Sequence, residues 1–288
     1  MGLNEAVNQP GVDIRCRDCH DNQNPRLDVA RWPSGYGYML DGMSYKAGKE
    51  QVFLQTAAGT PLVHIEVTPK GLWLHPKLGG QPLRIPQIKN SHQSLLADHG
   101  RLTCDSCHAS WVPTCLGCHM SYEEAGQQWD HSLQKVTDGV WHEKRWDIGI
   151  GRPSLGLKDA ETIDTFIPGM IMTLDHPQLE ETLFIRRFAR ISPHTTGPSR
   201  SCEGCHQSPV MLGLGKGKLS SDGDKLQFAP DMGLLADSLP ADAWTKLADK
   251  EHKQDTDYPR PFNAQDINRL YRAHRDQQPD ANGQDSSR

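Results

Sequence analysis

Several features that would mark other classes of protein are missing from this sequence. No stretch of its 288 residues approaches the roughly 18 to 20 apolar side chains that a membrane-crossing helix needs, and the longest candidate is a broken run around residues 166–174. We therefore expect no membrane span. Basic residues number 31 against 36 acidic ones, and no cluster of Lys and Arg stands out. Nucleic acid is therefore not an expected partner.

No cysteine stands outside one repeated pattern. The 8 cysteines form four Cys-x-x-Cys pairs, and a histidine follows each pair at once. Such a pair alone fits a redox dithiol, half of a zinc site or a thioether-linked haem, but only the last requires histidine at the next position. The residues of the four motifs are Cys16, Cys19 and His20; Cys104, Cys107 and His108; Cys115, Cys118 and His119; and Cys202, Cys205 and His206.

The spacing of this pattern fits the chemistry of covalent haem attachment. Two thiols add to the two vinyl groups of one porphyrin, and the imidazole beside the second cysteine becomes an axial ligand of the iron. A zinc ribbon built from the second and third pairs would have only residues 108–114 between them, against about 15 to 20 residues in the usual ribbon. We therefore predict four covalent haem c groups, with zinc sites and disulfides as the alternatives.

Two further segments extend the pattern beyond the attachment motifs. The first runs from His99 through residues 101–104 and 109–113 into the third motif, and the second comprises residues 193–196, 200–206, 209 and 212–215. Together they resemble segments of the extracytoplasmic multihaem c-type cytochromes of metal- and sulfur-cycling bacteria, over roughly residues 85–217. The resemblance implies a tetrahaem electron-transfer cytochrome. Because many members carry more than four haems, it also allows a fragment of a larger one.

The motif also carries an expectation about location. Thioether attachment of haem takes place outside the cytoplasmic membrane, so we expect a protein that is periplasmic, at the cell surface or extracellular. Residues 1–15 have neither the basic nor the apolar stretch of a secretory signal. We expect that signal to be missing from this numbering rather than from the natural protein.

We predict the fold class of a multihaem cytochrome c, mostly irregular chain and short helices around stacked haems, with small β-hairpins and C-terminal helices. Strands are expected at 51–56 and 62–67, and a hairpin is expected from 165–174 and 182–191. Residues 213–230 are expected to be a linker, followed by helices at 239–252 and 264–276, the second capped by Asn263. The expected parts are a first haem-binding segment with a small hairpin or meander (1–85), a three-haem core (86–215), a linker with terminal helices (216–276) and a disordered tail (277–288).

The remaining histidines supply candidates for the opposite face of each iron. His92 and His99 lie at helical spacing on one face, about 10 Å apart along the axis, which suits two adjacent haems. His194 carries the resemblance at its position, and His131 is the fourth predicted ligand because its distance from His119 permits a return across a neighbouring haem. For each of them, a structural imidazole is the alternative. Less favoured candidates are His75, His142 and His274, and solvent exposure is expected for His64, His176 and His252.

Two imidazoles on one iron close both of its faces, which suits electron transfer and leaves no position for a substrate. The leading hypothesis is a tetrahaem electron carrier that is not an enzyme and that exchanges electrons with redox partner proteins or an extracellular acceptor. One alternative is a reductase or oxidase of small nitrogen or sulfur oxyanions at one open haem. The other is a homo-oligomer or filament in which one protomer gives an axial histidine to the next. The arginines that keep the enzyme alternative open are Arg186, Arg187, Arg190 and Arg200.

Overall fold

The structure is a computed structural model that describes residues 14–21, 26–28, 52–88, 98–191, 195–222, 225–247 and 258–275. The chain divides into two compact units, residues 1–100 and 101–288. None of the described helices is long and apolar enough to cross a membrane.

The first unit joins one short helix to an antiparallel meander. Helix α1 (Cys16–His20) precedes strands β1 (Arg26–Asp28), β2 (Val52–Gln55), β3 (Pro61–Thr68), β4 (Gly71–Leu74) and β5 (Leu83–Ile85), which pair in chain order. The alternation that predicted strand β3 places Val63 and Ile65 inside, while His64 and Glu66 are only half-buried. The resulting core packs against Cys19 and consists of Leu54, Leu62, Ile65, Leu72 and Ile85.

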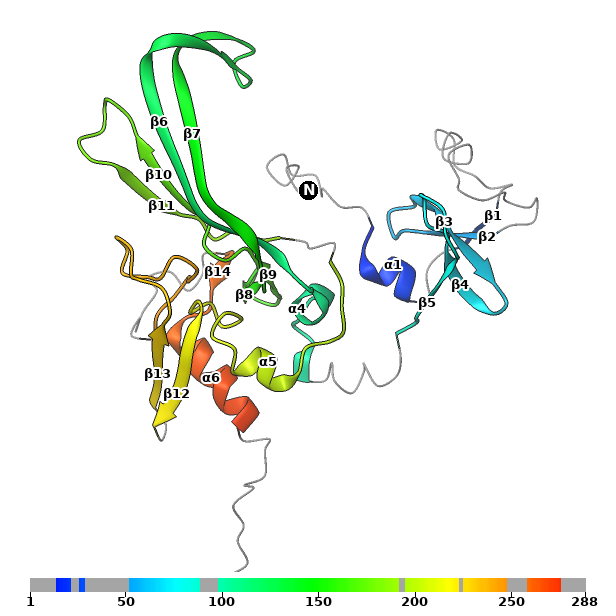
Figure 1. The fold of residues 1–288 in the computed structure, drawn as a ribbon. Coiled ribbons are helices and arrows are strands. Elements are labelled where there is room, and N and C mark those ends of the chain that lie inside the picture. The colour runs from blue at the N-terminus through cyan, green and yellow to red at the C-terminus, as the bar shows by residue number, and fades with distance from the viewer. Residues whose placement is uncertain are drawn as a thin grey trace, which may run out of the picture. The chain divides into compact units, whose positions relative to one another are not determined.

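A long β-hairpin dominates one sheet of the second unit. Strands β6 (Val112–Asp130) and β7 (Lys135–Gly151) pair along their whole length, and β10 (Ile171–Asp175) and β11 (Leu183–Arg186) complete the order β11-β10-β6-β7. Strand β10 reaches β6 only at residues 119–121. Beyond that point the β6–β7 hairpin continues as a two-stranded ribbon, which we call the arm (Figure 1).

The rest of the second unit gathers around an apolar core. Strands β14 (Arg260–Pro261), β8 (Ser154–Leu157) and β9 (Ile163–Phe166) form one sheet, and β12 (Gly217–Asp222) pairs with β13 (Lys225–Pro230). This part of the second unit also contains three helices: α4 (Cys104–His108), α5 (Cys202–His206) and α6 (Ala264–Arg275) (Figure 1). The core residues are Leu155, Leu157, Met211, Leu212, Leu214, Leu226, Phe262 and Ile267.

The predicted fold class is wrong, because the described chain is mostly β-sheet rather than irregular segments and short helices. The arm is the largest omission. It escaped notice because most of its outer residues are exposed on both faces, and such a strand shows no alternation of apolar and polar positions. The expected linker at 213–230 forms the β12–β13 hairpin, and residues 239–247 of the expected helix form turns. The expected tail from residue 277 lies outside the described residues.

Candidate haem-attachment sites

Three of the four Cys-x-x-Cys-His motifs form the same local structure. Helices α1, α4 and α5 are each a five-residue turn that coincides with its motif. Positions i, i+3 and i+4 of such a turn lie on one face, so both sulfurs and the imidazole can approach a single porphyrin. The second and fourth turns begin with side-chain caps: the Thr103 hydroxyl accepts a hydrogen bond from the Ser106 amide, and Ser201 accepts one from Gly204.

The histidines of these three turns share one hydrogen-bonding arrangement. Each places Nδ1 beside a main-chain carbonyl far away in sequence: Pro86 for His20 at 2.7 Å, Gly197 for His108 at 3.0 Å, and Leu270 for His206 at 2.6 Å. A carbonyl can only accept, so Nδ1 must carry the proton, and Nε2 is the nitrogen that can bind a metal. Ligand histidines in metalloproteins are oriented in this way.

The first site is fastened to the meander through a buried carboxylate. Asp18 is only 3% exposed and accepts hydrogen bonds from the main-chain amides of Arg15 at 2.7 Å and Ala57 at 3.0 Å. On the other side of the turn, the Ile88 amide donates to the His20 carbonyl at 2.9 Å. The turn is thus held between the β2–β3 loop and the segment that follows β5.

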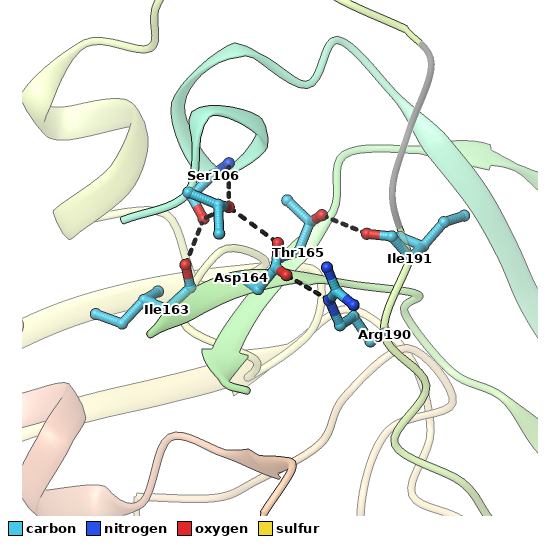
Figure 2. A network of polar contacts seen from close by, with 7 residues as sticks. Ser106, Ile163, Asp164, Thr165, Arg190 and Ile191 are labelled. Carbon is cyan, nitrogen blue, oxygen red and sulfur yellow. Dashed lines mark hydrogen bonds and ion pairs between the residues drawn. The ribbon is translucent and has the colours of Figure 1, made fainter. Parts of the chain in front are cut away.

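The second site rests on a buried polar network that connects α4 to β9 (Figure 2). Asp164 is 1% exposed and accepts hydrogen bonds from the Thr103 hydroxyl and the Thr165 amide, each at 2.9 Å, while Arg190 forms an ion pair with its other oxygen. The Ser106 hydroxyl donates to the Ile163 carbonyl at 3.0 Å. One carboxylate therefore fixes both the cap of the turn and the strand below it.

The fourth site rests on apolar packing instead. Cys205 packs against the core that contains Ile267, and α6 supplies the Leu270 carbonyl for His206. His274, also on α6, is buried, and its ring lies 5.8 Å from that of His206. The Leu270 carbonyl beside Nδ1 of His206 lies one helical turn before His274 on the same helix.

The second and fourth sites lie side by side, although their motifs are far apart in sequence. Residues 195–200 run along 107–111: the Gly197 amide donates to the His108 carbonyl at 2.8 Å, and the Arg200 amide donates to the Cys107 carbonyl at 3.2 Å. Arg200 also donates from its guanidinium to the Ala109 carbonyl. Its Nε is buried without a hydrogen-bond partner. The sequence contains no sign that the second and fourth motifs meet, because only the second and third motifs are close to each other along the chain.

The electrostatics of the cysteines distinguish among the chemistries that the motif allows. Burial, with a smaller contribution from Asp18, raises the pKa of the Cys19 thiol to about 11. Burial and then Cys107 raise the pKa of Cys205 to about 11, and burial also raises that of Cys107. A redox dithiol is activated by a lowered thiol pKa, whereas the pKa of each of these three cysteines is raised.

The donor geometry adds to this distinction. Among the described residues, which include all eight cysteines, no three His, Cys, Asp or Glu side chains converge as a zinc site would require. A haem asks for less from the protein, because the porphyrin supplies four nitrogens and the chain only one or two axial ligands. The three turns therefore fit haem c.

The third motif does not share this structure, although its sequence pattern is the same. Residues 115–119 lie within strand β6, where neighbouring side chains point to opposite faces. The Cys118 thiol contacts a Glu143 carboxylate oxygen at 3.3 Å, whereas His119 lies 3.0 Å from the Thr173 hydroxyl and 3.1 Å from Asp175. In this arrangement a cysteine and the histidine of one motif diverge, so the observed strand does not fit a haem.

The predicted opposite ligands are described only in part. His92 and His194 lie outside the described residues. His99 is half-buried in a short helical segment. His131 is exposed in the turn between β6 and β7, about 40 Å from His119 at the usual rise of a strand. Among the less favoured histidines, His75 lies 2.9 Å from Glu66 and His142 lies 2.9 Å from Glu123. His252 is outside the described residues, and His176 stacks on Tyr122.

Comparison with known protein families, with curated proteins and with solved structures finds no match for the chain. Arg190 and Arg200 were singled out in the sequence only as candidate oxyanion ligands. The sequence did not reveal that these two arginines, Asp164 and the carbonyl groups of Pro86, Gly197 and Leu270 hold the turns in place.

Proposed function

We propose that the chain is an extracytoplasmic electron carrier whose cofactors are covalent c-type haems. The observation that carries this proposal is the shared placement of His20, His108 and His206. Each donates Nδ1 to a distant main-chain carbonyl and thereby keeps Nε2 as the metal-binding nitrogen. When bound, each haem supplies an iron that gains and loses one electron. The chain's own part is to hold the axial histidines in place, so that a change in the charge of the iron requires little movement of the protein.

The carrier role is also supported by how the second and fourth sites are connected. The segment 195–200 holds the two turns together through the Gly197 and Arg200 amides, so the two cofactors would be neighbours. The half-buried Arg200 lies near both Cys107 and Cys205, and partial burial lowers its pKa. A cation in this position would favour the negatively charged groups of a porphyrin.

Fewer arginines remain for the enzyme alternative than the sequence suggested. Arg186 forms an ion pair with Asp237 and donates to two main-chain carbonyls, and Arg190 is paired with Asp164. Together with the carbonyl-bound Arg200, three of the four arginines that could have bound an oxyanion are engaged inside the fold. Arg187 is exposed.

A second candidate function has one specific observation in its favour. His131 lies in the turn at the end of the arm, far from the motif of its own strand. A histidine in this position could reach an iron in a second copy of the chain. It therefore favours a homo-oligomeric or filamentous carrier in which the arm supplies an axial ligand.

The test is to produce the chain with a signal for export in a host that attaches haem. The denatured mass reports the number of covalent haems, and electron paramagnetic resonance (EPR) of the oxidised protein reports their spin state. Low-spin iron with fast, multi-electron reduction on an electrode, and no turnover of nitrite, hydroxylamine, sulfite or tetrathionate, is expected. A chain that takes up no covalent haem would end the proposal.

Single variants sharpen the same test. His99→Ala should open one iron, produce a high-spin signal and allow carbon monoxide to bind when reduced. His176→Ala is the matched control, because that ring stacks on Tyr122. If His131→Ala opens an iron only in an oligomeric preparation, the second candidate function is supported. An unchanged oligomer and an unchanged spectrum would remove it.

A further inference from the structure

A groove of about 1010 Å³ lies between the β12–β13 hairpin and helix α6 in the second unit (Figure 1). The Tyr271 hydroxyl on α6 donates to the Ser221 hydroxyl on β12 at 3.3 Å. Leu226 of β13 and Ile267 of α6 also belong to the same apolar core. The fold of the unit therefore holds the two walls of the groove together.

The walls of the groove carry more positive than negative charge. Among the described residues that line it, Lys225, Arg269 and Arg272 are cations and Asp222 is a carboxylate. All four residues are exposed. The chain as a whole has a net charge of −5, so the groove has the opposite sign to the protein that contains it. A local potential of this kind attracts an anionic partner.

The remaining lining residues suit an extended segment of chain. Leu247 is half-buried and adds an apolar surface to the charged walls. Pockets for small molecules are mostly apolar and enclose their ligand, whereas charged and amide side chains predominate here. Those contributed by α6 follow helical spacing and so form a row on one face of the helix: Gln265, Asn268, Arg269 and Arg272. An acidic segment with an apolar side chain fits this row better than a small molecule does.

Nucleic acid is the other common anionic macromolecule, and the charge pattern does not favour it. Phosphate backbones are bound by stripes or clusters of Lys and Arg on strongly basic domains. This groove has three cations, one carboxylate among them, and an acidic chain around it. A protein segment with a few carboxylates matches that pattern.

Helix α6 separates the groove from the fourth attachment turn. On one side of the helix, the His274 ring lies 5.8 Å from that of His206. At 100° per residue, Arg269 and Arg272 lie about 140° and 160° around the helix from His274, so they face the other side. The groove is therefore separated from the turn by the width of one helix, about 10 Å. A partner bound there would lie close to the fourth motif.

We propose that this groove is the docking site for an acidic segment of a redox partner protein. Carboxylates of that segment pair with Lys225, Arg269 and Arg272, and an apolar side chain covers Leu247. Exchange of electrons at the fourth motif rests on the proposed function, whereas recognition of an acidic segment rests on the groove alone.

The experiment measures the binding of a fluorescent peptide to the full chain by anisotropy. The probe carries four glutamates around a central leucine, and its counterpart has glutamine in place of each glutamate. We expect the glutamate peptide to bind at least ten-fold more tightly than the glutamine peptide. Its affinity should fall several-fold when the NaCl concentration is raised from about 50 to 200 mM, because salt screens exposed charges.

Matched variants locate the binding site. Arg269→Gln/Arg272→Gln should weaken binding about ten-fold and Lys225→Gln about three-fold, as expected for exposed ion pairs. Asp222→Asn should tighten binding about two-fold, because it removes a negative charge from the groove. The controls are Arg275→Gln on the same helix and Lys218→Gln on the same hairpin, exposed residues that do not line the groove. These two variants should change the affinity less than two-fold.

Equal binding of the two peptides would overturn the inference, and so would equal losses in the groove variants and the controls. Tighter binding of a single-stranded oligonucleotide of the same charge would assign the groove to nucleic acid instead. A chain that carries covalent haem but does not bind the glutamate peptide refutes the docking site alone. A chain that binds the peptide but takes up no covalent haem refutes the proposed function and leaves the acidic-segment site in place.

Discussion

The second and fourth attachment turns have the same length and the same kind of cap, yet different forces hold them in place. Turn α4 is fixed by hydrogen bonds that converge on the buried carboxylate of Asp164. Turn α5 is fixed by apolar packing on α6 and by one carbonyl, that of Leu270. The two turns share their five residues, their cap and the carbonyl oxygen beside Nδ1. The contacts around each turn can differ as long as they hold these features in place.

This difference predicts two kinds of failure. A polar anchor has few members, and removing one leaves buried charge without a partner. An apolar anchor is spread over many contacts, so that damage to it is graded with the volume removed. Variants at the two sites can separate these behaviours.

Removal of the Asp164 carboxylate should have the largest effect. Asp164→Ala leaves Arg190 without its ion-pair partner and Thr103 without its acceptor. Breaking a buried ion pair from one side costs about 3–5 kcal/mol. We expect a loss of this size in the unfolding free energy of the second unit, measured by urea denaturation. The exposed Glu180, changed to Ala in the same unit, is the control and should stay within about 0.5 kcal/mol of the parent.

The apolar anchor should respond differently. Ile267→Ala removes a fully buried side chain from α6 and should cost about 2–5 kcal/mol. Because α6 carries the Leu270 carbonyl, the signal of the haem that we propose at the fourth motif should change while that at the second does not. Arg269→Ala, on the exposed side of the same helix, is the matched control. Equal changes in both haem signals would mean that the two anchors are not independent.

The sequence predicted those features that depend on neighbouring residues. Helix α6 belongs to this group. Asn263 caps α6 as expected, accepting from the Asp266 amide at 2.8 Å, while Asp266 accepts from the Asn263 amide at 3.1 Å. These interactions are local, so the pattern alone determines them.

Features that depend on distant residues were beyond the sequence. Arg190 and Asp164 resemble ordinary surface charges, and nothing in their spacing indicates that they pair inside the fold. The arm was missed because most of its outer residues are exposed on both faces and its sequence does not alternate between apolar and polar positions. The third motif shows the limit most clearly: its pattern equals that of the other three, but pairing with β7 and β10 overrides the local preference for a turn.

The first unit offers a third kind of anchor between these extremes. Asp18 accepts hydrogen bonds from two main-chain amides, whereas Asp164 is also paired with an arginine. Asp18→Asn keeps the shape and replaces one acceptor oxygen by a donor, which leaves one amide unsatisfied. We expect a loss of about 1–3 kcal/mol in the first unit, measured by the denaturation of that unit. The exposed Asp98, changed to Asn, should have no comparable effect.

The smallest expected effect is a pH dependence near the β11 strand. Burial alone would raise the pKa of Asp237, but the hydrogen bond and charge of Arg186 outweigh burial and hold that pKa below its ordinary value. A carboxyl group whose pKa is lowered on folding stabilises the protein fully above the unfolded pKa of about 3.9. That contribution is lost as the pH falls through the lower, folded pKa.

In Asp237→Asn this contribution is absent at every pH, so the drop in unfolding free energy between neutral pH and pH 3 should be shallower than in the parent. Asp231→Asn, an exposed carboxyl in the same unit, should leave the slope as it is. If Asp237→Asn also leaves the slope unchanged, the ion pair with Arg186 contributes nothing to acid stability.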